Sequence, residues 1–385
     1  MKNPIVRLGE VMNIDRTTAS ETECGNLPYV GLEHIEKDAG NFTADYRRQP
    51  ERLLATKFRF THRHVLYGKL RPNLNKVSLP DFDGVCTTEI LPLLPQPKRL
   101  DRRYLHGALL SRRFVKWASS SVSGANLPRL DPARLREYQI ELPDLAEQQR
   151  IAGRLEQSDR LRRTRRFALE VTDTILHAAF FQLFGNPIEN PHGFQIEPLE
   201  DLIQPTRPIS YGILMPGPDV PGGVPYIRVT DIHDGQILTG LVRRTTREID
   251  QAYKRSKLKA GDLLLSIRGH VGRMAVVPTC LDGANITQDT ARLASIDALE
   301  PHYLMRCLSS SGLQHRMDGL TRGAAVQGIN LGDVKELPIP VPPLSLQKKF
   351  AAIVERVEHL RSVQREALRQ ADHLFASLLH LAFSD

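Results

Sequence analysis

Cysteine, tryptophan and long apolar runs are scarce: the 385 residues include four cysteines and one tryptophan. The cysteines lie far apart and form no C-x-x-C pair, which argues against a zinc site and a disulfide framework and fits a reducing cytoplasm. The longest purely apolar stretches, such as residues 178–181, are much shorter than the roughly 18 residues that a membrane helix needs. No apolar segment of a signal peptide is visible in residues 1–13. We therefore expect a cytoplasmic protein with no membrane contact.

Several catalytic signatures are also missing. The sequence has no G-x-x-x-x-G-K-[ST] phosphate loop, so ATP hydrolysis by this chain is not expected. It contains neither the Glu-x-Lys of metal-dependent nucleases nor the Asn/Asp-Pro-Pro-aromatic tetrapeptide of amino-methyltransferases. Its histidines and serine runs form no recognisable triad. We therefore expect a chain with no catalytic residues, no metal site and no cofactor of its own.

The length and composition are those of a multidomain globular protein. At roughly 100–200 residues per domain, the chain has room for two domains or three. Apolar residues make up 41%, which is enough for sizeable cores and excludes intrinsic disorder. The net charge of +8 raises the expectation of a nucleic-acid partner, although charge speaks to association and not to fold.

Two halves of the sequence repeat each other at an offset close to 200 residues. The matching segments are 28–35 with 225–232, 65–71 with 263–268, and 140–143 with 339–342. The second match omits one residue and aligns Arg71 with Arg268. After the third match, Gln148 aligns with Gln347. A period this long excludes a solenoid and indicates a duplicated domain.

Each repeat ends in about 40 residues without proline, and both stretches are predicted to be helices. In the second stretch apolar residues follow a 4-3-4-3 spacing, a heptad seam interrupted by Gln364, and the first stretch has a rougher seam at an offset of 199. The predicted pairing positions are Leu161, Ala168, Ile175 and Ala179 in the first helix, and Ile353, Val357, Leu360, Ala367, Ala371, Leu374, Leu378 and Leu381 in the second. Two such helices predict an antiparallel coiled coil roughly 60 Å long at 1.5 Å per residue.

The parts of the chain outside these helices mix short strands and helices. Strand-like runs such as 261–267 and 275–277 alternate with helical ones such as 102–116 and 301–317, which indicates an α+β fold. The predicted organisation is a globular α/β domain over residues 1–144, a long helix over 145–185, a second globular α/β domain over 186–343 and a long helix over 344–385. The fold is thus a tandem duplication of a globular domain followed by a long helix.

The two globular domains differ in charge. Residues 1–144 carry 23 Lys and Arg against 17 Asp and Glu, whereas residues 186–343 carry 16 against 17, so the second domain would need local clusters to bind nucleic acid. Arg, Lys and Asn donate to phosphates and to base edges. The candidate DNA contacts are Lys69, Arg71, Asn73, Asn75, Lys76, Arg228, Arg243, Arg244, Arg247, Arg268, His270 and Arg273, and Arg47, Arg48, His62, Arg63 and His64 lie near the first cluster in sequence. Without a DNA partner, most of these would be ordinary solvated surface charges.

These motifs resemble those of a known family, the DNA-specificity subunits of type I restriction–modification enzymes. The resemblance covers essentially the whole chain and is carried by residues 28–35, 68–76, 261–276, 285–289 and the two helix entries at 142–151 and 341–350. It implies that each globular domain is a target-recognition domain reading one half of a bipartite DNA site, and that the helices set the spacer between the halves. It also implies partners: two modification subunits that use S-adenosylmethionine to methylate adenine N6, and a restriction subunit that uses ATP and Mg²⁺ to translocate and cut DNA.

Three other interpretations fit parts of the sequence. The chain could be a coiled-coil scaffold whose globular domains bind peptides, and the salt dependence of DNA binding would separate that case from a DNA-binding protein. It could serve a restriction system with a fused nuclease and methyltransferase, which neighbouring genes would reveal. A standalone enzyme would need a catalytic set that the sequence does not contain.

Overall fold

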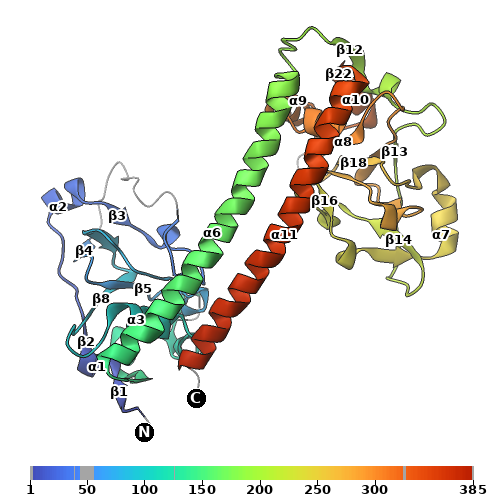
Figure 1. The fold of residues 1–385 in the computed structure, drawn as a ribbon. Helices are drawn as coiled ribbons and strands as arrows, with labels where there is room; N and C mark the ends of the chain where they lie inside the picture. Colours follow the sequence, from blue (N-terminus) through green and yellow to red (C-terminus); the bar gives the residue numbers. More distant parts are fainter. Residues whose placement is uncertain (1–2, 39, 44–55, 125, 324–326, 384–385) are drawn as a thin grey trace. The chain divides into compact units, whose positions relative to one another are not determined.

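The computed structural model describes residues 3–383 apart from 39, 44–55, 125 and 324–326 (Figure 1). The chain packs as two compact units, unit 1 with residues 1–167 and 364–385 and unit 2 with residues 168–363. The long helices α6 (Leu145–Phe184) and α11 (Leu344–Phe383) are each divided between the units. The α+β class, the duplicated globular domain and the long helix after each copy are confirmed, but the helices do not pack as segments separate from the globular domains.

Unit 1 contains a four-stranded sheet, a three-stranded sheet and the two antiparallel strand pairs β1–β11 and β9–β10, packed against short helices. Its strands are β1 (Ile5–Arg7), β2 (Met12–Ile14), β3 (Tyr29–Val30), β4 (Lys57–Phe60), β5 (Val65–Gly68), β6 (Val77–Ser78), β7 (Gly84–Thr87), β8 (Ile90–Pro95), β9 (Val122–Ser123), β10 (Arg129–Leu130) and β11 (Gln139–Glu141). Its short helices are α1 (Leu8–Val11), α2 (Glu21–Asn26), η1 (Leu32–His34), η2 (Pro72–Leu74), α3 (Arg102–Leu110), α4 (Arg112–Ser120) and α5 (Pro132–Glu137). The sheets have the strand orders β2-β8-β5-β6 and β3-β7-β4, and only the β3–β7 pair in them is parallel.

Unit 2 repeats this architecture. Its strands are β12 (Gln195–Pro198), β13 (Ser210–Tyr211), β14 (Val224–Ile227), β15 (Ile232–His233), β16 (Gln236–Ile237), β17 (Arg243–Thr245), β18 (Leu263–Ser266), β19 (Met274–Val276), β20 (Asn285–Ile286), β21 (Thr290–Leu293) and β22 (Pro338–Val341). Its short helices are η3 (Leu199–Leu202), η4 (Val229–Asp231), η5 (Thr239–Leu241), α7 (Arg247–Ala252), η6 (Lys254–Ser256), η7 (Thr279–Leu281), α8 (Pro301–Leu308), α9 (Ser311–Leu320) and α10 (Leu331–Lys335). The sheet β13-β21-β18-β19 matches the four-stranded sheet of unit 1, and the parallel pair β14–β20 matches β3–β7. The third strand of the smaller sheet joins opposite members of that pair, β4 on β7 in unit 1 and β17 on β14 in unit 2.

The helical segments predicted over 102–116 and 301–317 are each two helices. In unit 1, α3 stops and α4 starts at Ser111, whose side-chain oxygen accepts a hydrogen bond from the Phe114 amide. Serine is a strong N-cap residue because its hydroxyl satisfies an amide that the helix leaves unpaired. In unit 2, Ser310 occupies the same N-cap position of α9. The Ser111 cap therefore separates α3 from α4, whereas α8 and α9 separate at Ser309 and Ser310 without a side-chain capping hydrogen bond from Ser310.

Neither globular domain completes its core with residues of its own repeat. The core of unit 1 takes Phe375 from α11, and Phe383 of the same helix lies 5.1 Å from the Tyr104 ring. In unit 2 the last turns of α6 contribute to the core, and the centre of the Phe184 ring lies 4.7 Å from that of the Tyr303 ring. Each aromatic pair therefore joins a globular domain to the long helix of the other repeat.

A buried glutamine anchors the start of each long helix. Gln148 accepts from the Asp101 amide at 2.8 Å and donates to the carbonyl oxygens of Arg99 and Pro143 at 2.9 and 2.8 Å. Gln347 makes the same three hydrogen bonds, accepting from Glu300 N at 2.8 Å and donating to the oxygens of Ala298 and Pro342. Both glutamines are fully buried. The repeated residue thus ties the helix entry to the loop before α3 or α8.

The helices lie side by side and antiparallel within each unit (Figure 1). In unit 2 the last turns of α6 contact the first turns of α11, where the Phe180 and Phe350 rings are 5.5 Å apart. In unit 1 the Arg162 guanidinium lies 3.9 Å from the centre of the Phe375 ring. The predicted antiparallel pairing is confirmed.

The predicted seam is wrong at five of its twelve positions. Five predicted seam residues are exposed: Leu161, Ile175, Leu360, Leu374 and Leu381. Val357 and Ala371 are buried, and the others, Ala168, Ala179, Ile353, Ala367 and Leu378, are half-buried. Between residues 155–176 of α6 and 354–375 of α11 the buried positions are Leu155, Ser158, Arg162, Thr172, Leu176, Val354, Val357, Arg361, Ala371 and Phe375, of which only Val357 and Ala371 were predicted. The prediction chose Leu161, Leu360 and Leu374 because leucine is more hydrophobic than arginine. The side chains that are buried between the helices are those of the next residues, Arg162, Arg361 and Phe375.

Two arginines at equivalent places explain that shift. Arg162 donates to Asp159 at 2.6 Å, and Arg361 pairs with Glu358 at 2.5 Å, each within its own helix. With the guanidinium paired, the aliphatic stem of arginine packs like an apolar side chain. A buried arginine is therefore tolerated where the sequence pattern favoured the adjacent leucine.

The seam predicts a sharp contrast between neighbouring residues. Phe375→Ala removes a ring that is 7% exposed and is expected to cost about 3–5 kcal/mol, whereas Leu374→Ala, at a side chain 46% exposed, should cost below ~1 kcal/mol. Thermal or urea unfolding of the full chain measures both. Equal losses would place Leu374 in the seam after all.

The glutamine anchors predict a second contrast. Gln148→Ala removes one buried and two part-buried hydrogen bonds and is expected to destabilise the chain by about 2–4 kcal/mol, at roughly 1 kcal/mol per bond. Gln149→Ala is the matched control, because that neighbour is exposed. A shift in the urea midpoint for Gln148→Ala alone is the expected outcome, and similar midpoints for the two variants would contradict the anchor.

Candidate nucleic-acid interface

The predicted basic clusters lie on two equivalent loop edges. The first edge comprises the β5–β6 connection, residues 69–76, and the neighbouring segment 127–130. Along it Lys69 donates to Glu89 O at 2.9 Å, and Arg71 donates to Pro128 O at 2.8 Å, both through backbone amides. The second edge comprises the β18–β19 connection, residues 267–273, with 287–289 and the described residues of 322–329.

The hydrogen bonds correct the pairing of Arg71 with Arg268. In unit 2 the amide of Ile267 donates to Asp289 O at 2.8 Å, and the amide of Gly269 donates to Gln327 O at 2.9 Å. This pattern sets Ile267 against Lys69 and Gly269 against Arg71, without the dropped residue that the sequence comparison assumed. Arg268 therefore corresponds to Leu70, and the two arginines lie one position apart.

The corrected pairing exposes a conformational cost at Arg71. Arg71 has a φ of +51° and Gly269 has a φ of +73°, so both residues are left-handed. Glycine adopts this conformation freely, whereas a residue with a Cβ is strained by roughly 1–2 kcal/mol. The Arg71 residue is exposed, and its hydrogen bond to Pro128 is made by the backbone amide. The strained backbone therefore carries a guanidinium group that faces solvent.

The rest of the first cluster divides into surface and structural residues. Asn73 is exposed and Lys69 is half-buried. Asn75 is only 5% exposed and donates to Leu110 O at 3.3 Å, while Lys76 donates to Leu32 O at 2.6 Å. Asn75 and Lys76 are therefore wrong as free DNA contacts, because both side chains hold loops of unit 1 together.

The residues near that cluster divide in the same way. His62 and Arg63 are exposed, but His64 is buried, with Nε2 3.4 Å from an Asp15 carboxylate oxygen. Burial lowers the pKa of His64, although the Asp15 carboxylate opposes that shift. His64 is therefore a structural residue. Arg47 and Arg48 lie outside the described residues.

In the second domain the predicted arginines do not form one cluster. Arg243 and Arg247 are exposed on β17 and α7, and Arg244, also exposed, donates to Gly223 O at 2.9 Å. Arg228 is wrong as a free donor, because its guanidinium binds the buried Asp231 carboxylate at 2.6 and 3.0 Å. These hydrogen bonds raise the pKa of Arg228.

The second edge itself brings together fewer of the predicted residues. Arg268 and His270 are exposed on it, and Arg268 Nη1 lies 3.3 Å from Gln288 Oε1. Arg273 is half-buried and lines a pocket instead. Sequence reasoning missed Arg322, which exchanges two backbone hydrogen bonds with Gly328, the partner of Arg268 in a β-bridge. Its position next to Gly323 of the repeated Gly-Ala pair was the available signal.

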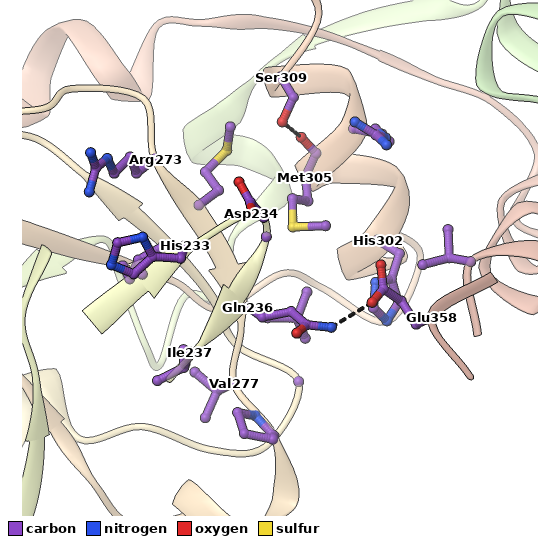
Figure 2. Close-up of a pocket in the computed structure, with 18 of the residues that line it drawn as sticks. His233, Asp234, Gln236, Ile237, Arg273, Val277, His302, Met305, Ser309 and Glu358 are labelled. Carbon is purple, nitrogen blue, oxygen red and sulfur yellow. Dashed lines mark hydrogen bonds between the residues drawn. The ribbon is translucent and has the colours of Figure 1, made fainter. Parts of the chain in front are cut away.

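The pocket lies in unit 2 between the β15–β16 hairpin, α8 and α11 and has a volume of about 920 Å³ (Figure 2). Gln236 of the hairpin donates to the Glu358 carboxylate across one side, and Ser309 donates to Met305 O on another. In the part of the chain that the structure describes, no group of three or more His, Cys, Asp and Glu side chains could hold a metal ion. Gln236, Glu358 and Ser309 thus make internal contacts in the view of Figure 2, and no reaction chemistry is assigned to the pocket.

The long helices carry exposed apolar side chains outside their seam. Those on α6 are Leu161, Phe167, Val171, Ile175 and Phe181, and those on α11 are Leu360, Val363, Leu374 and Leu381. An 18-residue window of α6 reaches a mean hydropathy of 1.2 with no more than two charged residues, so by length and composition alone it could cross a membrane. That criterion is weak by itself, because helices of soluble proteins also meet it. Exposed apolar helix surfaces of this kind are typical of protein contacts.

The strained arginine leads to a testable expectation. Arg71→Gly should relieve the left-handed strain, offset by about 0.5–1 kcal/mol of added chain entropy, so its stability should equal or slightly exceed that of the parent. Its loss of one cation should lower the salt-dependence slope of binding to a long duplex by about 1. Arg71→Ala removes the same charge but keeps the strain, and Arg71→Lys keeps the charge. A slope unchanged in both Gly and Ala variants would exclude a phosphate contact at Arg71.

Comparisons with known proteins bear on the whole chain. A family model described as the type I restriction modification DNA specificity domain matches residues 2–170 and 218–369. The type I restriction enzyme EcoBI specificity subunit of Escherichia coli is 28% identical over 330 residues, covering 78% of this chain and 67% of that protein. The MjaVIII specificity subunit of Methanocaldococcus jannaschii is 22% identical over 318 residues, covering 77% and 73%.

Solved structures extend the likeness to the fold. The S subunit of a type I restriction-modification system from M. genitalium aligns over 99% of this chain and 96% of its own, with a TM-score of 0.60 at 15% identity. A chain from a structural study of complex assembly and conformational transition of the type I R-M system aligns over 99% and 97%, with a TM-score of 0.57 at 22% identity. At these identities the likeness concerns the fold alone.

Proposed function

The chain belongs to the type I restriction–modification DNA specificity family, and from this premise we propose that it directs such a complex to a split DNA site. Each globular domain reads one half of the site, and the paired helices set the spacer between the halves. The observation that carries this proposal is the duplication: the same four-stranded sheet, parallel strand pair and glutamine-anchored 40-residue helix occur twice in one chain. A bipartite site needs two similar readers at a fixed separation.

The loop edges are the proposed reading surfaces. They carry exposed cations and amides, Arg71 and Asn73 on the first and Arg268, His270 and Arg322 on the second. Side chains of these types contact phosphates and read base edges in the grooves of DNA. Arg243, Arg244 and Arg247 are proposed as additional phosphate contacts, because they are exposed on neighbouring elements of the second domain.

The reaction steps are assigned to partner subunits. We propose that two modification subunits dock on the exposed apolar positions of α6 and α11 and methylate adenine N6 with S-adenosylmethionine. A restriction subunit joins through that complex and uses ATP and Mg²⁺ to translocate and cut DNA. In this proposal the chain itself contributes recognition without catalysis and works in the cytoplasm.

Mapping N6-methyladenine tests the function directly. A methylation-free host expresses this chain with the modification subunit encoded beside it, and the methylated positions are sequenced. Two short half-sites around a fixed gap, present only when this chain is expressed, are the expected result. A soluble, assembled complex that methylates nothing, together with DNA binding that is insensitive to salt, would favour a protein scaffold instead.

Shortening both helices tests their role as a spacer. Deleting one heptad from each, residues 163–169 and 362–368, preserves the heptad register and removes about 10 Å at 1.5 Å per residue. At roughly 3.4 Å per base pair, the methylated motif should keep both half-sites and lose about three base pairs of spacer. An unchanged spacer in a folded variant would exclude a measuring role for the helices.

A further inference from the structure

Three large apolar side chains stand in solvent on one short segment of unit 2. Tyr211, Leu214 and Met215 are 56%, 54% and 72% exposed. Single exposed apolar residues are common, but a local group of large ones indicates a binding surface. Among the residues of 3–144 that the structure describes, the exposed large apolar side chains are Ile5 at 62% and Leu127 at 45%, which lie far apart in the sequence. In the residues that the structure describes, the two globular domains therefore differ in this feature.

The segment that presents these side chains is held firmly. Ile213 is fully buried, its amide donates to Ile286 O at 2.7 Å, and its carbonyl oxygen accepts from Gln288 N at 2.9 Å. Gly212 passes so close to Ile286 that a Cβ would lie 1.9 Å from the carbonyl oxygen, so a side chain there would collide with the backbone. Downstream, Thr245 Oγ1 donates to Pro216 O at 2.7 Å. Leu214 and Met215 thus project from backbone that is anchored on both sides.

Cations border the segment at its beginning. The buried Arg292 guanidinium donates to Pro208 O at 2.8 Å and to Arg255 O at 2.6 Å, which fixes η6 beside the start of β13. Lys254 and Arg255 of η6 are exposed. The start of β13, which leads into Tyr211, is therefore held beside a short helix that carries two exposed cations.

Cations also border the segment at its other side. Gln288, which bonds to Ile213 through its amide, accepts at its side chain from Arg268 Nη1. Arg268 bridges to Gly328, and Gly328 exchanges hydrogen bonds with Arg322 at 2.8 and 3.0 Å. Arg268 and Arg322 are exposed. The anchored apolar segment is thus bonded to elements that carry exposed cations, residue types that contact DNA phosphates.

We propose that Leu214 and Met215 form an apolar wedge that enters the duplex at the half-site of the second domain and partly unstacks one base step. Lys254, Arg255 and Arg268 hold the phosphates beside it. Minor-groove proteins use leucine and methionine in this way and offset the cost of unstacking with the surrounding contacts. The wedge rests on the proposed function, since it deepens how the second domain reads DNA, and it predicts sensitivity to base-step flexibility at that half-site.

The test uses the full chain assembled with its modification subunit and a duplex that carries the mapped split site. 2-Aminopurine is placed at successive steps of each half-site, and its fluorescence rises where stacking is lost. The parent complex should brighten the probe at one step of the second half-site. The double variant Leu214→Ala with Met215→Ala should abolish that signal and weaken binding about tenfold, while the salt slope stays unchanged because the cations remain.

The fluorescence and binding test has one matched control variant and three outcomes that would overturn the wedge. Ile196→Ala removes an exposed apolar side chain of the same unit on β12, which pairs only with β22, and should bind like the parent. Parent-like fluorescence and affinity in the double variant would overturn the wedge and leave the proposed function intact. Loss of assembly with the modification subunit in the double variant would make this segment a protein contact and overturn the wedge. A parent complex that neither binds nor methylates a split site would overturn both proposals.

Discussion

The structure depends on a reciprocal exchange of helix ends. Each globular domain lacks part of its own apolar core and obtains it from the long helix of the other repeat, Phe375 in unit 1 and Phe184 in unit 2. The antiparallel direction of the helices follows, because only that direction brings the end of one helix to the start of the other. Burial of these aromatic rings therefore couples the stability of each reader to the pairing of the helices.

Because of this exchange, the two repeats must keep the residues that join each globular domain to the helices, whereas their loop edges can differ. The glutamine anchors keep identical hydrogen bonds, and the phenolic oxygens of Tyr104 and Tyr303 both donate to a carbonyl on the strand before the long helix. The loop edges have no such constraint. One edge uses a strained arginine where the other uses glycine, and the smaller sheets add their third strand to opposite partners. Two readers of different sequences can thus stand on one scaffold.

Much of this architecture was predictable from repetition, since an offset near 199 marked the duplication, the helices and the paired glutamines. The helix seam was not, because hydrophobicity alone ranks Leu360 above Arg361 and cannot register that Glu358 pairs with the guanidinium. The equivalence of Arg71 and Arg268 failed for a related reason: identity of residue type suggested it, whereas the backbone hydrogen bonds set Arg71 against a glycine. Asn75, Lys76 and Arg228 had suitable chemistry for DNA, but their internal partners are distant in sequence or hidden in turns. The exposed Tyr211, Leu214 and Met215 carry no periodic signal, and only burial distinguishes them from core residues.

The exchanged helix ends also impose an order on folding during synthesis. Unit 2 is built from residues 168–363, so its core is available once α11 has largely left the ribosome. Unit 1 needs Phe375 and Phe383, which are made only after residues 168–363 of unit 2, although the globular domain of unit 1 emerges before them. At roughly 5–20 residues per second, the first globular domain waits about 10–50 s for the segment of α11 that completes its core. The N-terminal reader is thus the part of the nascent chain with the longest exposure of unpaired apolar surface, and the part for which protection by chaperones matters most.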